Sequence, residues 1–506
     1  MSHQIIETMQ KYQQSRTQFA QQVAEMAQRP GNIQFLRDAG AMQLLRPLLL
    51  DNVPSIQQTA ALALGRLANY SEELAEAVVS NEILPQLVYS LSEQNRFFKK
   101  AASFVIRAVA KHTPELAQAV VDAGALSSLA VCLEEFDPTV KESGAWALGY
   151  ISGHTAELAT AVVDAGVVPL LVLCIQEPEL ALKRICVSSL SDIAKHSPQL
   201  AQAIVDAGAI HHIAPLISHN DAKLKRQACG CLAQIAKHSV DLAEYVVEAE
   251  IFPNILHCLQ DDNIHVQRNA ATCIREVAKH TPELAKLIVN AGGGAALVDY
   301  ISTSSGNARL PGIMALGYIS AFSETLALAI IVQKGIEPLK DALVSETEDH
   351  IRAAAAWSLG QVGRHTVEHA QAIAEADCLR RLLEVNQLDV SEDLKEKAKR
   401  ALKAILKKCT ALDALEPLMR EADKGIVKYI LAQFSKVLPN DRMAKRSFVQ
   451  TGGLQYVQEL KEQSGGGELL EYIEAINACY PQEIVEYYSP KYAEKLIKLI
   501  DDSHQN

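Results

Sequence analysis

Apolar side chains return at helical spacing along most of the chain, and this pattern itself recurs at a nearly constant interval. Between positions 116 and 151, leucine, valine, isoleucine and alanine recur every three or four residues in three successive runs, which predicts three amphipathic helices. The clearest marker of the repeat is an Asp-Ala-Gly sequence. Aligning the copies places its last position at residues 40, 82, 124, 166, 208, 250, 292, 335 and 377, which is a repeat of about 42 residues.

Polar residues at the borders of these runs predict where each helix begins and ends. Thr113, Ser197 and Thr281 each precede a proline, which predicts an N-cap followed by proline in the first helical turn. The glycine of Asp-Ala-Gly predicts a left-handed residue that ends the short first helix. Each unit is therefore expected to contain a short first helix, a sharp turn, and a second and a third helix.

A repeat of this kind predicts an elongated all-α fold, because one unit cannot bury its apolar face until its neighbours cover it. We predict a right-handed α-solenoid, a superhelix read as one elongated domain with helical caps at both ends. The expected segments are a capping helix at 1–35, eight regular units at 36–374, degenerate units at 375–463, and a glycine-rich linker with capping helices at 464–506. The alignment places one extra residue between Phe322 and Gly335.

Charge and composition exclude several classes of function. The net charge of -12 argues against nonspecific binding of nucleic acid, which needs a basic surface. No apolar run approaches the roughly 20 residues that span a bilayer, and the first residues do not resemble a signal peptide, so we expect a cytosolic origin and no membrane partner. Cys132, Cys174 and Cys258 occupy one position of the repeat, which predicts small core residues in a reducing compartment.

One stretch resembles a catalytic motif, because His365-Thr-Val-Glu-His369 matches the H-x-x-E-H zinc pattern. The repeat offers a simpler explanation, since one repeat position is shared by His112, His154, His196, His238, His280 and His365. Tyr70 and Phe322 fill that position elsewhere, so we expect a packing role and no metal. Gly292-Gly-Gly294 lacks the following Lys-Ser/Thr of a phosphate-binding loop. We expect no catalytic residue, no cofactor and no enzymatic activity.

The third helices are expected to line the concave face of such a solenoid. The candidate partner-binding residues there are Arg66, Trp146, Tyr150, Asp192, Gln234, Glu276, Tyr318, Trp357 and Gln361. Trp146-x-x-x-Tyr150 and Trp357-x-x-x-Gln361 resemble the Trp-x-x-x-Asn sequence with which import adaptors of the armadillo-repeat family hold extended basic peptides. None of the positions that match the family's asparagine carries asparagine. The resemblance therefore implies an armadillo fold, while nuclear import is disfavoured and a merely solvated row remains an alternative.

Two sets of cations recur on the same helices. One set lies at the start of successive third helices and consists of Lys99, Lys141, Lys183, Lys225, Arg309 and Arg352. Because cations oppose the helix dipole at that end, we predict salt bridges between units, with contact to an acidic partner as the alternative. The other set lies on one amphipathic helix and contains Lys395, Lys399, Arg400, Lys403, Lys407 and Lys408. It is a candidate contact for an acidic surface such as tubulin, with a solvated face as the alternative.

The serial Ala-Lys-His-Thr-Pro-Glu-Leu-Ala segments at 110–117 and 278–285, the Asp-Ala-Gly turns and the closing Tyr-Ser-Pro-Lys-Tyr at 488–492 resemble armadillo proteins of the ciliary and flagellar central apparatus over essentially the full length. The resemblance implies a non-enzymatic scaffold on a central-pair microtubule that is needed for ciliary and sperm motility. It further implies a place in the cytoplasm, cytoskeleton and axoneme, with tubulin and other central-apparatus proteins as partners and self-association along the microtubule left open. The residues alone also fit a cargo or signalling adaptor that binds extended peptides in its concave groove.

Overall fold

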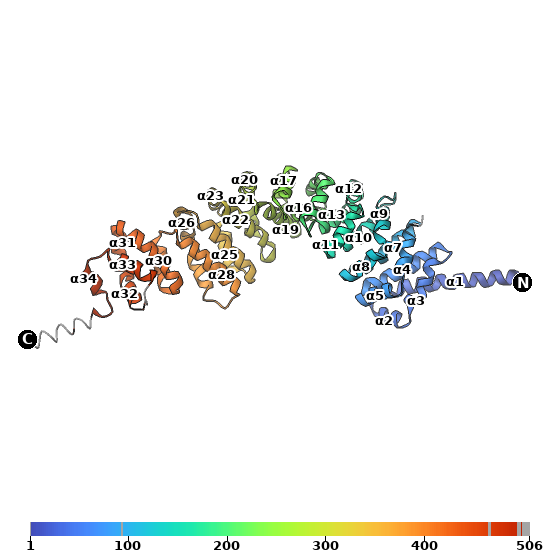
Figure 1. The fold of residues 1–506 in the computed structure, drawn as a ribbon, viewed down its shortest axis with the longest axis horizontal. Helices are drawn as coiled ribbons and strands as arrows, with labels where there is room; N and C mark the ends of the chain where they lie inside the picture. Colours follow the sequence, from blue (N-terminus) through green and yellow to red (C-terminus); the bar gives the residue numbers. More distant parts are fainter. Residues whose placement is uncertain (1, 93–94, 464–466, 493–496, 498–506) are drawn as a thin grey trace, which may run out of the picture. The chain divides into compact units, whose positions relative to one another are not determined.

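The structure, a computed structural model, describes residues 2–92, 95–463, 467–492 and 497. Within these ranges every regular element is helical, as Figure 1 shows. Contacts between residues divide the chain into two compact units, Met1–Val277 and Ala278–Asn506. No single helix in the described ranges is both long enough and apolar enough to cross a membrane.

The first unit opens with a long helix, α1 (Ser2–Met26), and continues with sets of three helices. The first helices are α2 (Pro30–Asp38), α5 (Glu72–Ser80), α8 (Pro114–Asp122), α11 (Ala156–Asp164), α14 (Pro198–Asp206) and α17 (Val240–Glu248). The second helices are α3 (Ala41–Leu45) with η1 (Arg46–Leu50), α6 (Leu84–Leu91), α9 (Ala125–Leu133), α12 (Val167–Ile175), α15 (Ala209–Ile213) with η2 (Ala214–Ser218), and α18 (Phe252–Cys258). The third helices are α4 (Pro54–Tyr70), α7 (Arg96–Ala110), α10 (Pro138–His154), α13 (Leu180–Ala194), α16 (Ala222–Ala236) and α19 (Ile264–Ala278).

The second unit repeats the same order before it becomes irregular. Its sets are α20 (Pro282–Asn290), α21 (Gly293–Thr303) and η3 (Gly306–Ala308) with α22 (Leu310–Phe322), then α23 (Glu324–Val332), α24 (Ile336–Ser345) and α25 (Asp349–Gly363), then α26 (Val367–Glu375), α27 (Cys378–Val385) and α28 (Glu392–Leu406). The remaining helices are α29 (Leu412–Glu421), α30 (Lys424–Val437), η4 (Leu438–Asn440), α31 (Arg442–Gln450), α32 (Gly453–Gln463), α33 (Glu468–Asn477) and α34 (Gln482–Tyr487). Positions 464–466, at the start of the predicted linker, and positions 493–496 and 498–506 lie outside the described ranges. The predicted segment boundaries and the single elongated domain stay predictions.

The predicted N-caps of the first helices are confirmed. The hydroxyls of Thr113, Ser197 and Thr281 each accept a hydrogen bond at 3.2 Å from the backbone N–H three residues later, and proline follows in the first turn. These hydroxyls satisfy one of the N–H groups that a helix leaves without an internal partner. The short first helices are therefore defined by local sequence.

The left-handed turn after each first helix is also confirmed, with one correction. Gly40, Gly124, Gly166, Gly208 and Gly292 have φ between 65° and 88°, and Glu82, Glu250 and Asp377 hold the same conformation without being glycine. Gly335 was the wrong assignment in the eighth set, because its φ is -67° while Lys334 has φ 64°.

The regular spacing of the repeat therefore continues from Gly292 to Lys334, and the extra residue lies between Lys334 and the start of α25. Position 335 requires glycine for a different reason, since a Cβ there would lie 2.5 Å from the Cγ2 atom of Ile330.

Successive third helices pack closely at the glycines of their Leu-Gly sequences. A Cβ on Gly149 of α10 would lie 2.5 Å from the Ser189 hydroxyl on α13, and a Cβ on Gly317 of α22 would overlap the ring of Trp357 on α25. Cys132, Cys174 and Cys258 are fully buried or nearly so, which confirms that they are core residues. Close helix contacts and small side chains thus form the core between neighbouring sets.

Candidate partner-binding surface

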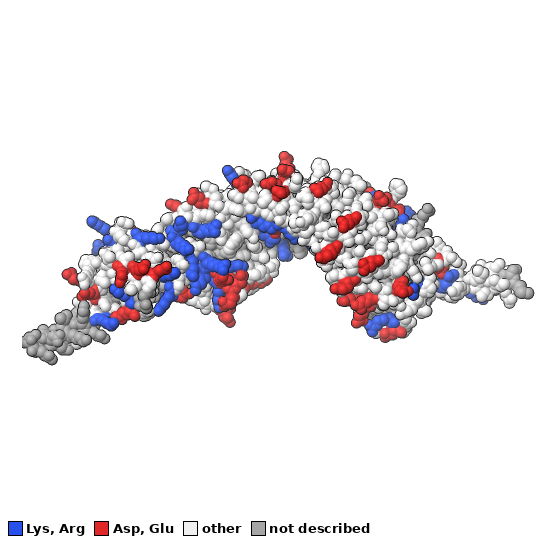
Figure 2. Space-filling model, in the orientation of Figure 1, with Lys and Arg blue, Asp and Glu red and all other residues white. Residues whose placement is uncertain are grey.

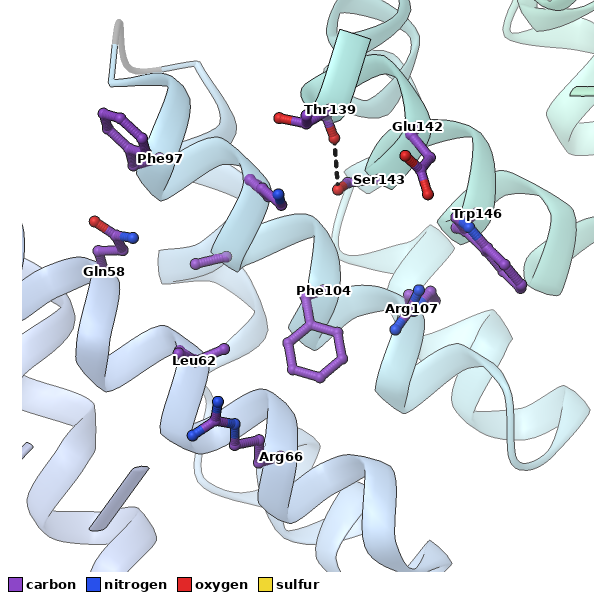
Figure 3. A pocket seen from close by; sticks show the side chains of 12 residues that line it. Gln58, Leu62, Arg66, Phe97, Phe104, Arg107, Thr139, Glu142, Ser143 and Trp146 are labelled. Atoms are coloured by element: carbon purple, nitrogen blue, oxygen red, sulfur yellow. Dashed lines mark hydrogen bonds between the residues drawn. The ribbon is translucent and has the colours of Figure 1, made fainter. Parts of the chain in front are cut away.

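The third helices of the first unit enclose a hollow of about 520 Å³ between α4, α7 and α10 (Figure 3). Its lining comprises Gln58, Leu62, Arg66, Phe97, Lys100, Ala101, Phe104, Arg107, Thr139, Glu142, Ser143 and Trp146. The hollow brings together two of the predicted row residues, Arg66 and Trp146. In Figure 3 the Phe104 ring lies between Arg66 and Arg107.

The centre of the hollow combines aromatic rings with positive charge. The guanidinium carbon of Arg107 lies 5.0 Å from the centroid of the Phe104 ring and 5.2 Å from that of Trp146, which is within the range of a cation–π interaction. Burial lowers the pKa of Arg107, although Tyr150 and Glu142 act in the opposite direction. Burial and the nearby charge of Arg107 also lower the pKa of Lys111. Burial is therefore the larger cause of both shifts.

The other row residues of the first unit are engaged locally. Tyr150 stacks on Trp146 with ring centroids 5.7 Å apart. Asp192 pairs with Lys195 at 3.0 Å, and the side-chain oxygen of Gln234 accepts a hydrogen bond from Lys237 at 2.8 Å. Glu276 is only 7% exposed and pairs with Arg275. None of these four residues lines the hollow, so the first unit does not gather the row into one site.

Arg66 is also engaged, because its Nη1 donates to the carbonyl of Ala24 on α1 at 2.5 Å. In the second unit, Tyr318 and Trp357 make an edge-to-face contact with ring centroids 5.1 Å apart, and Gln361 is half-buried on the same helix as Trp357. The predicted aromatic residues thus pack in pairs along the third helices. Their role in binding stays a prediction.

Apart from Arg66, sequence reasoning missed the cations that line these hollows. A second hollow of about 420 Å³ lies between α13, α16 and α19 and is lined by Arg226 and Arg268 among other polar residues. Lys100, Arg226 and Arg268 occupy one repeat position, because whole repeats separate them in the sequence. That spacing was available in the sequence and could have identified them.

The repeated histidines form hydrogen bonds between neighbouring sets. In each case Nε2 lies 2.6–2.8 Å from a carbonyl oxygen in the last turn of the preceding third helix. The pairs are His112 with Ala68, His154 with Ala110, His196 with Ser152, His238 with Ala194, and His365 with Ser320. Burial lowers the pKa of His196 and His365, and the hydrogen bond partly offsets that effect. The expected packing role is confirmed, with a polar contact that the sequence did not predict.

The two histidines of the apparent zinc motif make the same kind of contact with backbone carbonyls. His365 Nε2 faces the Ser320 carbonyl, and His369 Nε2 lies 2.9 Å from the Glu324 carbonyl. Glu368 accepts a hydrogen bond from Thr366 at 2.5 Å. Among the described residues no three His, Cys, Asp or Glu side chains are grouped as metal ligands would be. The Nε2 atoms of both imidazoles are therefore hydrogen-bonded to backbone carbonyls.

Four of the six repeated cations at the start of the third helices form the predicted salt bridges to the next set; among the described residues Lys183 has no ion pair, and Arg352 pairs with Asp349 of its own helix at 3.5 Å. Lys99 pairs with Glu135 at 2.5 Å, Lys141 with Glu177, and Lys225 with Asp261, each across 36 residues. The partner carboxylates precede the third helix of the next set, which confirms the interpretation as bridges between units.

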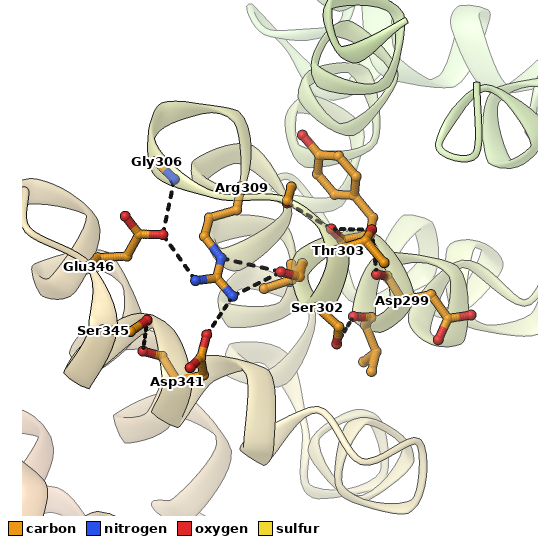
Figure 4. Close-up of polar contacts among 12 residues, drawn as sticks. Asp299, Ser302, Thr303, Gly306, Arg309, Asp341, Ser345 and Glu346 are labelled. Atoms are coloured by element: carbon orange, nitrogen blue, oxygen red, sulfur yellow. Dashed lines mark hydrogen bonds and ion pairs between the residues drawn. The ribbon is translucent and has the colours of Figure 1, made fainter. Parts of the chain in front are cut away.

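The same cations also reach carbonyls at the C-terminal ends of second helices. Lys183 donates to Ile175 at 3.0 Å, Arg352 to Leu343 at 3.0 Å, and Arg309 to Ile301 at 2.9 Å. Arg309 additionally contacts Glu346 and Asp341 at 3.0 Å (Figure 4). A cation that is unfavourable at the start of one helix is thus favourable at the end of another.

The predicted basic helix is α28, which buries Leu394, Leu402 and Ile405. The sequence placed Lys407 and Lys408 on the same helix, which was wrong, because α28 ends at Leu406 and these two lysines lie in the turn that follows it. Lys and Arg side chains gather over this helix on the visible face of the second unit (Figure 2). Several are paired: Lys395 with Glu392 at 3.5 Å, Lys399 with Asp423 at 2.9 Å, and Arg400 with Glu396.

Lys403 and Lys407 lie 5.8 Å and 5.7 Å from the ring centroid of Tyr429. Lys408 is exposed and has no ion-pair partner in the described part of the chain. Lys407 and Lys408 are consequently the members best placed to meet an acidic partner.

Comparison with known proteins agrees with this architecture. The armadillo/beta-catenin-like repeat family matches residues 29–69 and 197–237, and the HEAT repeat family matches residues 251–281. Sperm-associated antigen 6 of mouse (Mus musculus) is 68% identical over 499 residues, which cover 98% of each chain, and the human (Homo sapiens) protein gives the same values. The chain belongs to the sperm-associated antigen 6 family.

As a member of the sperm-associated antigen 6 family, the chain is an all-α solenoid of armadillo repeats. The crystal structure of an engineered protein has the same fold, with a TM-score of 0.71 and 24% identity over 87% of this chain and 98% of that one. Armadillo repeats indicate protein–protein interaction, so the family assignment supports a scaffold role. The name of the relatives points to a sperm-related location.

Proposed function

We propose that the chain is a non-enzymatic scaffold of the axonemal central apparatus, associated with a central-pair microtubule and needed for ciliary and sperm motility. The observation that carries this proposal is the 68% identity with sperm-associated antigen 6 over 98% of both chains. Identity at this level over the full length leaves the solenoid and its surfaces largely unchanged. The other expected partners are further proteins of the central apparatus.

The basic helix and the turn that follows it supply the proposed contact with tubulin. Between residues 378 and 461 the chain has 17 Lys and Arg against 11 Asp and Glu, although its net charge is -12. Lys407 and Lys408 are exposed there, and an acidic surface attracts such a cluster. The paired members, Lys395, Lys399 and Arg400, are expected to contribute less.

Localisation in ciliated cells tests the proposal directly. A fluorescently tagged full-length chain is expected along the axoneme, between the outer doublets, and its removal is expected to impair beating. A uniform cytosolic or nuclear signal without axonemal enrichment would refute the proposed location.

Co-sedimentation tests direct contact with microtubules. The double substitution Lys407→Glu, Lys408→Glu should lower microtubule affinity about tenfold, since reversing close charge pairs costs about 1 kcal/mol or more in all. The loss should shrink as salt is raised. The matched control is Lys11→Glu, Lys286→Glu, which makes the same change in charge at exposed positions elsewhere. Equal pelleting of both variants would assign Lys407 and Lys408, which follow α28, to solvent.

A further inference from the structure

We propose that a short amphipathic helix of a partner protein binds to the second unit at the place where one set of helices has no first helix. The bound helix is apolar on one side and carries lysine or arginine beside that side. This goes beyond the proposed function, because the surface differs from the proposed tubulin contact. The groove along the third helices takes no part in it either.

The set that contains α29 and α30 has no first helix. Residues 364–377 include α26 between α25 and α27, whereas only residues 407–411 join α28 to α29. α29 packs against α27 as α27 packs against α24, so α29 is a second helix. α30 packs against α33, which follows α31 and α32 as the third helix of a complete set. One first helix is therefore left out between α26 and α31.

The spacing of the left-handed turns agrees with this assignment. Asp377 follows α26 and Gly452 follows α31, and both have positive φ. They are 75 residues apart, nine fewer than two repeats of 42, and the first helices from α5 to α26 are each nine residues long. α31 is itself a first helix, because a Cβ on Gly453 would overlap Phe448 in the way described for Gly335.

A hollow of about 440 Å³ lies between the two first helices that flank this place. Gln371 of α26 lines one side, and residues of α31 line the other. In the regular part of the unit a first helix stands between two such neighbours, as α23 does between α20 and α26. Figure 1 shows α26 and α31 along the same edge of the second unit. The hollow thus occupies the position of the absent helix.

The hollow has an apolar floor and apolar sides. Phe434 and Phe448 are each 1% exposed and form the floor, with ring centroids 4.6 Å apart. Leu412 and Val437 are half-buried at the sides, and Met443 is 77% exposed. Each first helix from α5 to α23 buries its third, fourth and seventh residues. A partner helix with the same apolar stripe would cover these side chains.

The charges around the hollow favour a basic helix. Asp413, Glu416 and Asp441 line it, and no lysine or arginine of the described ranges does so. None of the three carboxylates has an ion-pair partner in the described part of the chain. The cations nearest to them in the sequence lie outside the lining; these are Lys407, Lys408, Arg442 and Lys445. Three carboxylates beside an apolar surface attract lysine or arginine on the flanks of a bound helix.

One segment of this chain has the sequence pattern of a first helix. Residues 489–497 are Ser-Pro-Lys-Tyr-Ala-Glu-Lys-Leu-Ile, with serine, proline and apolar residues in the order found in the regular sets. The start of this segment is already held within its own unit. Lys491 pairs with Glu462 at 3.3 Å, and the ring centroids of Tyr492 and Tyr487 are 5.3 Å apart. These contacts favour a separate partner as the occupant of the hollow.

The test uses full-length protein and a fluorescently labelled peptide. The peptide has the sequence of residues 281–290 with lysine at positions 283, 287 and 290, which gives Thr-Pro-Lys-Leu-Ala-Lys-Lys-Ile-Val-Lys. Because so short a helix is marginal in water, we expect a Kd on the order of 100 µM from anisotropy. A peptide with glutamate for every lysine should not bind. Proline at the sixth position should weaken binding at least about tenfold, because proline breaks a helix.

Two protein variants test the location. Ser447 is exposed on α31 and lines the hollow, so Ser447→Trp should fill it and weaken binding about tenfold or more. The control is Gln455→Trp, at an exposed position of α32 outside the lining. Glu416→Lys should weaken binding about fivefold or more, whereas its control on the same helix, Glu421→Lys, should change it less than about twofold. Circular dichroism verifies that each variant is folded, and Glu416→Lys serves if Ser447→Trp is not.

The inference is overturned if the lysine peptide does not bind at about 1 mM, or if the controls weaken binding as much as the hollow variants. Equal binding of the glutamate peptide would remove the charge argument, and equal binding of the proline peptide would show that the occupant is not a helix. A peptide of residues 489–500 that binds more tightly than the probe would assign the hollow to another copy of this chain. Microtubule pelleting of Ser447→Trp should match that of the unmodified chain, so loss of peptide binding leaves the proposed tubulin contact untouched.

Discussion

Replacing His196 by phenylalanine isolates the polar contact that joins neighbouring repeats. His196 Nε2 lies 2.7 Å from the carbonyl oxygen of Ser152, which is buried in the last turn of α10. Carbonyls in a last turn have no partner within their helix. Phenylalanine keeps the ring, as Phe322 does at the equivalent position, but leaves this carbonyl without its donor. We expect a loss of about 1–3 kcal/mol in the free energy of unfolding.

The size of this loss should depend on pH. Burial lowers the pKa of His196 in the folded chain, so the unfolded chain, with a histidine pKa of about 6.5, takes up its proton first. The stabilisation is therefore fully present above about pH 6.5 and is lost as pH falls toward the lower, folded pKa. His196→Phe has no such group, so the difference in unfolding free energy between the two proteins should narrow as pH falls.

Urea unfolding followed by circular dichroism would measure the loss in the free energy of unfolding and its dependence on pH. Measurements at about pH 7.5 and about pH 5.5 lie on either side of the pKa of histidine in the unfolded chain. His211→Phe is the control, because His211 is exposed and should show little change at either pH. The role assigned to the hydrogen bond would be refuted if His196→Phe and the unmodified chain had the same free energy of unfolding at neutral pH. It would also be refuted if the difference between their free energies of unfolding widened in acid.

Three further predictions follow from the packing and ion pairs. Gly317→Ala should destabilise the chain by about 3 kcal/mol because of overlap at the helix contact, whereas Gly124→Ala should cost only about 1 kcal/mol of backbone strain; thermal melts would compare them, and equal losses would contradict the close contact. Lys99→Ala and Glu135→Ala should be non-additive by about 0.5–2 kcal/mol in a double-mutant cycle, and simple additivity would mean that the bridge contributes nothing. His365→Ala should lower the melting temperature without changing the zinc content in metal analysis, and stoichiometric zinc lost on this substitution would revive the metal hypothesis.

The helices, caps and turns could be predicted because their signals are local. A hydroxyl such as that of Thr113 acts on the N–H group three residues later, so the short sequence contains all the necessary information. The error at Gly335 has a physical origin. Glycine serves both left-handed turns and close contacts, and the sequence does not state which is needed. Lys334 adopts the left-handed conformation of the turn, while Gly335 is needed because a Cβ there would overlap Ile330.

The binding surface could be predicted only in part. Lys99 and Lys100 are adjacent in the sequence, but Lys99 is buried against Glu135 and Lys100 is exposed in the hollow. Which of the two is available depends on a carboxylate in the next repeat and on the stacking of helices. For the same reason, the row of predicted residues did not reveal that Glu276 is buried while Arg107 remains without an ion pair.

The histidine contacts have a consequence for local unfolding. Each ring satisfies a carbonyl of the preceding repeat, so a repeat that opens removes a hydrogen bond from its neighbour as well as its own packing. Where a histidine joins two repeats, we therefore expect their amide hydrogens to exchange together, in blocks that span more than one repeat. Where Phe322 replaces it, a boundary between exchange blocks is expected.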